Sequence, residues 1–343
     1  MPACQPTAGW PAPVAICRAG SSETGNRTRP LAQPAPGQTE TGAQSPLDRN
    51  TPSLWNAMHQ RWCGWDGAFD SLRFHALHPM MARRERAADT AHLARLIAAD
   101  ADLSCCWRQV VGSASRGSAP DECVAVEAAK ALGALVGTRG SGRTPVDNVR
   151  DASARNDLGS AARVPLAAQR GLRRFVGRGG CSSCHVGPLL FNGDSGAIGL
   201  PFFVRPGVVD PGRHAGISAL RASRYNLLGP WADATAPDGV DAAQKARFVD
   251  QQQRNIGEFQ VPCLRNVAVT TPCTHAGRLA TPGAVLNHCS TLHLDRLHAD
   301  GEQILQTLHL SRDQHTDLLA FLSSLADPKA IRWRATPDAR PWR

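Results

Sequence analysis

The sequence predicts an all-α protein built from two helical units that are connected by long loops. Apolar residues recur at helical spacing over Thr90–Ala99, Asp121–Val136 and Leu166–Val176. From Gly187 to Arg265 the chain is rich in Pro and Gly, is expected to be mostly loop, and shows little of the alternation that half-buried strands require. A chain of 343 residues is long enough for about two domains.

The N-terminal region differs in amino-acid composition from the rest of the chain. Residues 1–48 are rich in Pro, Gly, Ser and Thr and have no periodicity, so we expect a disordered or truncated N-terminal segment. The start, MPACQPTAGW, has neither a basic region nor a clean apolar run, so no secretory signal peptide is visible. From Asn50 onward tryptophan and phenylalanine become frequent, and the first helical unit is expected there.

The expected helices have recognisable ends. Asp121 is suited to cap the second helix, and a run of glycines that follows Val176 ends the third. Ser311 and Gln314 form a capping box that opens the last clear helix. Residues 138–160 lack such signals and are expected to link the two units.

Composition excludes several classes of protein. The 38 basic and 29 acidic residues give a net charge of +9, and the basic residues are spread rather than clustered. We therefore expect no nucleic-acid site, and an acidic redox protein is a better electrostatic partner. No apolar run reaches the ~18 residues of a membrane-spanning helix. The eleven cysteines are odd in number and are not spaced like a small disulfide scaffold.

The most specific motif follows the third helix directly. Cys181-Ser182-Ser183-Cys184-His185 fits C-x-x-C-H, the pattern of c-type haem attachment. Two thiols one helical turn apart can each bond a haem vinyl group, and the next residue places an imidazole under the iron as the proximal ligand.

Other meanings of this motif are weaker. Half of a zinc site would need a second ligand pair at compatible spacing, and none is present in the sequence. A thioredoxin-like dithiol would follow a strand and open a helix, whereas a helix and glycines come before Cys181.

Longer segments surround this motif. They read RNTPSLWNAMHQRWCGWDGAFDSL, GRGGCSSCHVGPLLFNGDSGAIGLP, DPGR and VPCLRNVAVTTPCTHAGRLAT. Together they resemble the bacterial di-haem cytochrome c peroxidases, particularly the branch that contains the methylamine-utilisation di-haem enzyme. The resemblance covers roughly Leu47 to Ala326.

The resemblance implies a domain organisation. It implies two cytochrome-c-like helical domains with calcium between them. Residues 49–137 would be the remnant of the N-terminal, peroxidatic domain, 161–328 the C-terminal haem domain, and 329–343 a basic tail. It also implies the periplasm, hydrogen peroxide as substrate, a small electron-donor protein (cytochrome c or cupredoxin), and a homodimer.

The resemblance also implies roles for individual residues, according to their positions in the matching motifs. Cys181, Cys184 and His185 match the C-terminal haem site, and Trp65 matches the tryptophan that relays electrons between the haems. Glu85 matches the acid that works on bound peroxide, since a carboxylate there can move a proton between the peroxide oxygens. His75 stands at a position where the family has glutamine. Asn50, together with Thr270 and Pro272, matches the family's calcium site, and oxygen ligands suit that cation.

The sequence also departs from the family pattern. The family carries another C-x-x-C-H upstream of Asn50, whereas residues 1–48 contain only Cys4 and Cys17 and no histidine. Covalent attachment in the usual way is therefore not expected there, and the sequence predicts one haem c where the family uses two.

The sixth ligand of the remaining iron is left open by the sequence. The position that usually carries Met or Tyr is Cys289 here. A thiolate can ligate haem iron, but a neutral thiol is a weak ligand. His288 and His275 are alternatives, and an open or water-bound iron is a third.

Three functions fit these observations. The first is a haem c oxidoreductase that reduces hydrogen peroxide with electrons from a small redox protein. The second is a mono-haem electron-transfer protein without peroxidase activity, which the single attachment motif favours. The third is a non-functional truncated copy.

Overall fold

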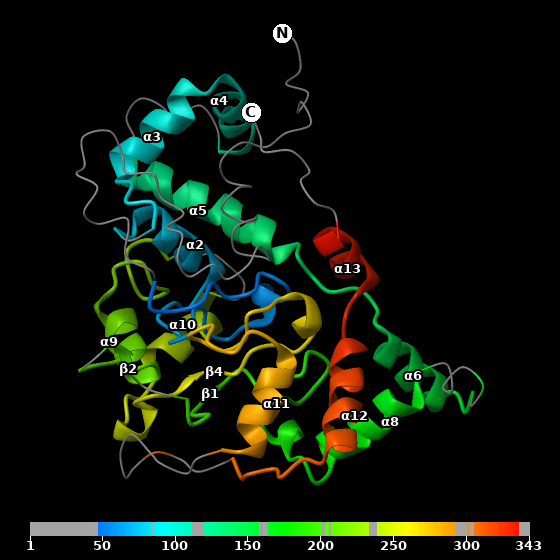
Figure 1. The fold of residues 1–343 in the computed structure, drawn as a ribbon. Coiled ribbons are helices and arrows are strands. Elements are labelled where there is room, and N and C mark those ends of the chain that lie inside the picture. The colour runs from blue at the N-terminus through cyan, green and yellow to red at the C-terminus, as the bar shows by residue number, and fades with distance from the viewer. Residues whose placement is uncertain are drawn as a thin grey trace.

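The computed structural model describes residues 47–83, 85–111, 120–157, 159, 164–200, 203–205, 207–232, 239–292, 301 and 305–335. The segment expected to be disordered or truncated, 1–48, therefore lies almost wholly outside the described residues. Within them the protein is mainly helical, which confirms the all-α prediction (Figure 1). No described helix is both long enough and apolar enough to cross a membrane.

Helices supply both halves of the architecture. In the first half they are α2 (Leu72–Met81), α3 (Thr90–Ala99), α4 (Ala101–Val110), α5 (Asp121–Gly137) and α6 (Pro145–Ala154). In the second half they are α8 (Leu166–Val176), α9 (Arg213–Ala222), α10 (Gly239–Arg247), α11 (Pro282–Ser290), α12 (Arg312–Ser323) and α13 (Pro328–Ala335). The helices expected at 90–99, 121–136 and 166–176, and the helix opened by Ser311, are all present.

Strands and 3-10 turns are short. Two antiparallel pairs are found among the described residues, β1 (Ser195–Gly196) with β4 (Phe259–Gln260) and β2 (Phe203–Arg205) with β3 (Val208–Val209). The 3-10 turns are η1 (Ala57–His59), η3 (Cys181–Ser183), η4 (Gln253–Asn255) and η5 (Val267–Val269).

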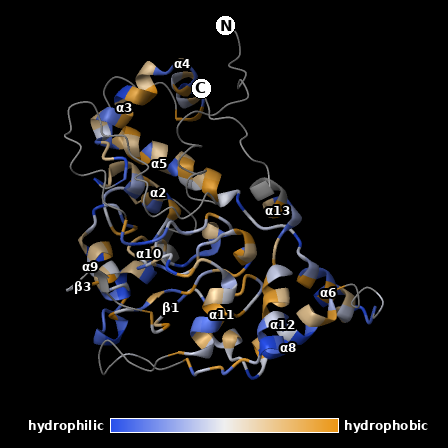
Figure 2. Cartoon of the chain, viewed as in Figure 1, coloured by the Kyte–Doolittle hydropathy of each residue, from blue (hydrophilic) through white to orange (hydrophobic). Residues whose placement is uncertain are grey.

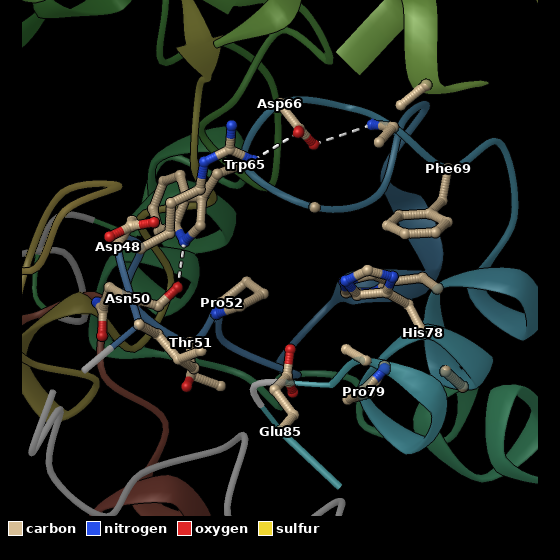
Figure 3. A pocket seen from close by; sticks show the side chains of 18 of the residues that line it. Asp48, Asn50, Thr51, Pro52, Trp65, Asp66, Phe69, His78, Pro79 and Glu85 are labelled. Atoms are coloured by element: carbon tan, nitrogen blue, oxygen red, sulfur yellow. Dashed lines mark hydrogen bonds and ion pairs between the residues drawn. The ribbon is translucent and has the colours of Figure 1, made fainter. Parts of the chain in front are cut away.

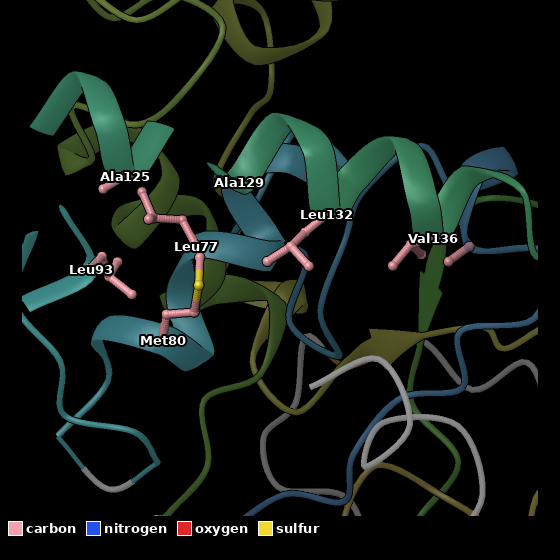
Figure 4. Packing of buried hydrophobic residues seen from close by; sticks show 8 residues of the cluster. Leu77, Met80, Leu93, Ala125, Ala129, Leu132 and Val136 are labelled. Atoms are coloured by element: carbon pink, nitrogen blue, oxygen red, sulfur yellow. The ribbon is translucent and has the colours of Figure 1, made fainter. Parts of the chain in front are cut away.

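The first hydrophobic cluster lies between α2 and α5 (Figure 4). Leu77 and Met80 of α2 are 2% and 4% exposed and pack with Ala129 and Leu132 of α5. Figure 2 shows that these helices mix hydrophobic and hydrophilic residues, as expected of helices with one buried face. Leu93 joins α3 to the same cluster.

The second hydrophobic cluster lies between α8 and α12. Phe175 and Phe321 are 3% and 1% exposed, with ring centroids 5.0 Å apart. The helices approach so closely at Gly171 that a Cβ atom there would overlap the backbone carbonyl of Asp317. Because η3 begins five residues after α8 ends, this packing also fixes the position of the C-x-x-C-H turn.

Gly171→Ala is expected to destabilise the protein by roughly 1–3 kcal/mol, because α8 and α12 must separate to admit a methyl group. The free energy of unfolding, measured by urea titration, checks this. Gly137→Ala is the matched control, because no atom lies within 4 Å of a Cβ at that position. Equal stability of the two variants would contradict the close approach.

Several helices were not expected from the sequence. Residues 138–160, expected to be a linker, contain α6, which begins with a capping box of Thr144 and Asp147 and has Pro at its first position. The stretch from Gly187 to Arg265, expected to be mostly loop, contains α9 and α10. Helices α9 and α10 are short, of 10 and 9 residues, and lie in a stretch rich in Pro and Gly, which indicates loop in the sequence.

Candidate functional site

A cavity of about 930 Å³ opens beside α2. Its walls come from α2, from the segment 47–69, from α5 and from the loop that follows β3. Trp65, His75 and Glu85, which are spaced ten residues apart in the sequence, all line it, and Figure 3 labels Trp65 and Glu85 in its wall. Apolar side chains make up much of the remaining wall.

Glu85 lies just beyond the end of α2. A turn holds it there, with its backbone N–H donating to the carbonyl of Ala82 at 2.9 Å. Burial raises the pKa of the Glu85 carboxyl. A carboxyl group with a raised pKa takes up a proton more readily than an exposed glutamate does.

His75 and His78 occupy neighbouring turns of α2. Burial lowers the pKa of His75 to about 4, and the nearby His78 acts in the same direction. Burial also lowers the pKa of His78. Phe69 lies against both imidazoles, with ring centroids 5.3 Å from His75 and 5.1 Å from His78. Both histidines are therefore neutral at pH 7.

Sequence reasoning missed two residues of this wall, His78 and Pro79. The signal that could have found them is helical spacing, because His78 follows His75 by one turn and therefore lies on the same face. Because residues 72–81 were not expected to form a helix, the three-residue spacing of His75 and His78 did not indicate a shared face.

Trp65 connects the cavity to the C-terminal half of the chain. Its indole Nε1–H donates to the carbonyl of Asn50 at 2.8 Å, and its own carbonyl accepts from the N–H of Gln260 in β4. Trp65 is thus fixed between the two halves of the fold.

Arg49 forms an ion-pair centre next to Trp65. Its guanidinium contacts both carboxylate oxygens of Asp210 at 2.8 Å and one oxygen of Asp66 at 2.5 Å. Burial alone would raise the pKa of Asp210, but hydrogen bonds and charge from Arg49 outweigh it and lower that pKa. The two ion pairs of Arg49 link the DPGR segment, which begins at Asp210, to the loop that contains Trp65 and Asp66.

Arg213, the last residue of DPGR, supports the same loop from the other side. It donates to the carbonyl of Gly67 at 2.7 Å, and its guanidinium carbon lies 4.3 Å from the ring centre of Trp62. Trp62 is 5% exposed and also has Lys245 within 5.5 Å of its ring. These contacts anchor the tryptophan-rich loop in which Trp65 lies.

The residues expected to bind calcium also meet at this junction. The Asn50 amide donates to the carbonyl of Pro272 at 2.9 Å, and the Asn50 backbone N–H donates to the carbonyl of His275 at 2.7 Å. Thr270 precedes Pro272 by two residues, and its hydroxyl donates to the carbonyl of Asn266. The structure therefore joins Asn50 directly to one of its two expected partners.

The C-x-x-C-H residues form a compact turn. Gly180 takes a left-handed conformation with φ of 61°, and Cys181–Ser183 form η3. The N–H groups of Cys184 and His185 both donate to the carbonyl of Cys181. Neither thiol forms a disulfide, and burial raises the pKa of Cys181.

His185 is oriented by the main chain. Its Nδ1 lies 2.9 Å from the carbonyl of Leu190, so Nε2 is the nitrogen left for a metal. Burial lowers the pKa of His185, and hydrogen bonds to the carbonyls of Leu190 and Pro262 oppose that effect. A neutral imidazole held in this way is the form that ligates iron.

The candidates for the sixth ligand lie in different surroundings. Cys289 of α11 is close enough to Cys181 for the two thiols to interact, and burial raises the pKa of Cys289 to about 11. His288 is engaged elsewhere, with Nε2 2.8 Å from the carbonyl of Ile198. His275 is stacked on Phe259 at 3.5 Å between ring centres.

The chain is similar in sequence to known haem proteins. Residues 24–155 match the family model for di-haem cytochrome c peroxidase. The chain is 28% identical over 287 residues to the methylamine utilization protein MauG of Methylorubrum extorquens, covering 83% of this chain and 67% of that protein. The chain resembles the di-haem cytochrome c peroxidases.

One further peroxidase and two solved structures are also similar to the chain. The cytochrome-c peroxidase IdrP2 of Pseudomonas sp. (strain SCT) is 24% identical over 299 residues, which is 85% of this chain and 72% of that protein. The diheme peroxidase BthA from Burkholderia thailandensis has a TM-score of 0.61 at 19% identity, covering 97% and 91% of the two chains. A MauG-like protein associated with microbial copper homeostasis has a TM-score of 0.59 at 21% identity, covering 88% and 81%. These neighbours confirm the fold class, an all-α protein of the cytochrome-c-like kind.

A buried ion pair lies near the C-x-x-C-H turn. Asp147 of α6 contacts Arg265 through two bonds of 2.7 Å, and the N–H and hydroxyl of Thr144 donate to the same carboxylate. Hydrogen bonds from Arg265 hold the pKa of Asp147 well below its usual range. Arg265 also donates to the carbonyl of Pro188, so α6 is tied to the loop after the haem motif.

Asp147→Asn is expected to lower the free energy of unfolding at pH 7 by about 3 kcal/mol, since Arg265 loses a nearly buried partner. A depressed pKa gives stability that is present above the unfolded-state value of about 3.9 and is lost as the pH falls through the folded-state value. The advantage of the wild type over the variant should therefore begin to shrink below about pH 4 and continue to shrink as the pH falls toward the folded-state value. Urea titrations at pH 7 and pH 3 check this.

Asp151→Asn is the control for this prediction, because Asp151 lies on the same helix and pairs with the exposed Arg143. We expect a much smaller effect there. An Asp147→Asn effect no larger than that of Asp151→Asn would show that the ion pair does not stabilise the fold.

Proposed function

We propose that this protein is a haem c oxidoreductase that reduces hydrogen peroxide with electrons from a small redox protein, a cytochrome c or a cupredoxin. One observation carries the proposal. Trp65, His75 and Glu85 come from three separate segments and line one cavity. Peroxide reduction needs an electron route and a proton-handling group at one place, and this cavity contains candidates for both.

The C-x-x-C-H turn fits a haem. Cys181 and Cys184 lie on one turn and form no disulfide, and the Leu190 carbonyl fixes the imidazole of His185. Cys181 packs against the hydrophobic cluster of α8 and α12, which gives the apolar surroundings that a porphyrin requires. When bound, the haem supplies one-electron redox chemistry.

The residues of the cavity would handle the protons. Reduction of peroxide consumes two electrons and two protons and yields two waters. Glu85, with its raised pKa, would hold and pass on a proton at its carboxyl oxygens beside the peroxide, while the redox partner supplies the two electrons and solvent supplies the two protons, so that both oxygens leave as water. His75, neutral because burial lowers its pKa, would accept a hydrogen bond from peroxide and orient it.

We further propose calcium at Asn50, Thr270 and Pro272. The Asn50 amide already contacts the Pro272 carbonyl, and its nitrogen and oxygen can exchange places by rotation. Oxygen donors of this kind suit calcium. Calcium at 100 times its dissociation constant should stabilise the protein by about 2.7 kcal/mol in thermal or urea unfolding. Asn50→Ala should remove that gain, and an unchanged gain would contradict this ligand.

The partners and location are proposals of the same kind. The net charge of +9 favours an acidic electron donor. The relatives make the periplasm the natural compartment, and a homodimer is the expected assembly. Size-exclusion chromatography with light scattering tests the oligomeric state.

One sequence feature favours a second function. The printed sequence contains a single C-x-x-C-H, which suits a mono-haem electron-transfer protein. A steady-state assay separates the two. The full chain, matured with haem, is mixed with reduced cytochrome c and hydrogen peroxide, and donor oxidation is followed by absorbance. Two donors oxidised per peroxide support the peroxidase. Reversible one-electron redox without peroxide consumption supports electron transfer, and absence of both indicates a non-functional copy.

A further inference from the structure

Tyr225 is the single tyrosine of the chain, and its hydrogen-bond partner is a carboxylate. It lies three residues beyond the end of α9 and is half-buried. Its hydroxyl donates to Oε1 of Glu122, the second residue of α5, at 2.5 Å. Arg224 places its Nε 3.3 Å from the same oxygen and its guanidinium carbon 6.0 Å from the centre of the tyrosine ring. The phenol is therefore held against a carboxylate of known orientation.

The side chains that surround Tyr225 continue into the wall of the cavity beside α2. The ring centre of Tyr225 is 6.3 Å from that of Phe74, and the next residue of α2, His75, lines the cavity. Tyr225 packs against the first hydrophobic cluster, as do Leu72 and Ala76, which line the cavity as well. Packed side chains of α2 thus connect the tyrosine to the cavity and provide a route for an electron.

The contact with Glu122 makes this phenol easier to oxidise than a phenol without a base. Loss of an electron turns a phenol into a strong acid, so its proton must pass to a base as the electron leaves. The Glu122 oxygen is already in hydrogen-bond contact and can take that proton without movement of the chain. Until then the phenol keeps its proton, because burial, together with the hydrogen bond and the charge of Glu122, raises the pKa of Tyr225 to about 12.

We propose that Tyr225 is a redox-active side chain, which gives one electron to an oxidant in the cavity beside α2 and its phenolic proton to Glu122. The O–H bond of Tyr225 breaks, an O–H bond forms on the Glu122 carboxylate, and a tyrosyl radical remains. An electron from the donor protein, with the proton from Glu122, restores the phenol. Tyr225 would thereby store one oxidising equivalent while the donor protein is absent.

The natural oxidant is hydrogen peroxide, so this part of the inference rests on the proposed function. Peroxide takes up two electrons and two protons and yields two waters. Tyr225 supplies one electron, the haem supplies the other, and solvent supplies the two protons. The oxidation of Tyr225 itself can be measured with a different oxidant, which needs no peroxide.

Electron paramagnetic resonance identifies the residue that is oxidised. The full chain, matured with haem, is mixed with hydrogen peroxide and frozen. We expect an organic-radical signal that narrows when the protein is made with ring-deuterated tyrosine, because Tyr225 is the one tyrosine that can carry the label. Tyr225→Phe, which keeps a ring beside Phe74, should remove that signal. Peroxide consumption without a tyrosyl signal would overturn the inference and leave the proposed function standing.

A second oxidant tests the role of Glu122. A laser flash generates tris-bipyridine ruthenium(III), a one-electron oxidant, and absorbance follows its reduction by the ferric protein. The difference between the wild type and Tyr225→Phe is the part that depends on the tyrosine. Glu122→Gln should slow this part by roughly tenfold or more, since the amide cannot take the proton. Glu127→Gln is the matched control, because Glu127 lies on the same helix and pairs with Lys130.

The outcomes separate the inference from the proposed function. Equal rates in Glu122→Gln and the wild type would show that Glu122 does not receive the proton and would overturn the inference. A protein that forms the Tyr225 radical with ruthenium(III) but does not consume peroxide would retain it and overturn the proposed function. Circular dichroism shows whether each variant keeps its helices, and if Glu122→Gln loses them, the spectrum of the labelled wild type decides.

Discussion

Replacing Glu85 with Gln is expected to lower peroxide turnover by roughly 10²–10⁴-fold. The amide keeps the shape of the side chain but cannot carry a proton between the peroxide oxygens. Binding of peroxide should change far less, so the loss should appear in kcat. Steady-state oxidation of reduced cytochrome c, measured over a range of peroxide concentrations, gives both parameters.

The pH profile adds a second readout for Glu85. Burial raises the pKa of this carboxyl, so its ionised form is lost at a higher pH than for an exposed glutamate. Activity that needs the carboxylate should therefore decrease at acidic pH. Glu85→Gln should remove this acidic decrease from the pH profile of activity. Glu127→Gln is the control, since Glu127 forms a helix-surface pair with Lys130. If Glu85→Gln retained wild-type kcat, Glu85 would have no role in proton transfer.

Replacing both cysteines of the haem motif with Ser is expected to abolish covalent haem. Cys181 and Cys184 lie on one turn and form no disulfide, so their removal leaves that turn with no thiol to form a thioether. A pyridine haemochrome spectrum after acid–acetone extraction measures the covalent haem per chain, which should fall from about one to zero.

The single variants refine this prediction. Cys184→Ser should leave one thioether and shift the haemochrome band toward that of a haem with one vinyl group intact. Cys123→Ser, which changes a free cysteine of α5, should keep full loading. Covalent haem that persists in the Cys181/Cys184 double variant would place the attachment site elsewhere.

The sequence predicted four of the helices and missed others, among them α2. The helix over 121–136 has apolar residues on a regular face, and its core positions Ala125, Ala129 and Leu132 are buried as that face requires. Helix α2 contains two histidines and Pro79, and its hydrophobic and polar residues show little segregation. Its helical form depends on packing against α5, which no local pattern reveals.

The candidate site shows the same division. The C-x-x-C-H turn is local in sequence, so its spacing was sufficient to predict it. The meeting of Trp65, His75 and Glu85 depends on tertiary folding, and the sequence reached it only through resemblance to a family. The Arg49–Asp210 contact joins residues 161 positions apart, and no periodicity or spacing can predict such a pair.

The hydrogen bond from the indole of Trp65 to the carbonyl of Asn50 has a consequence for how this side chain would conduct charge. An indole that loses an electron becomes a strong acid and readily gives its proton to any competent base. A peptide carbonyl is too weak a base to take that proton. The oxidised indole would therefore keep it, so the electron hole could move on without waiting for a proton to return. An acceptor of higher basicity at this position, such as a carboxylate, would instead trap the side chain as a neutral radical.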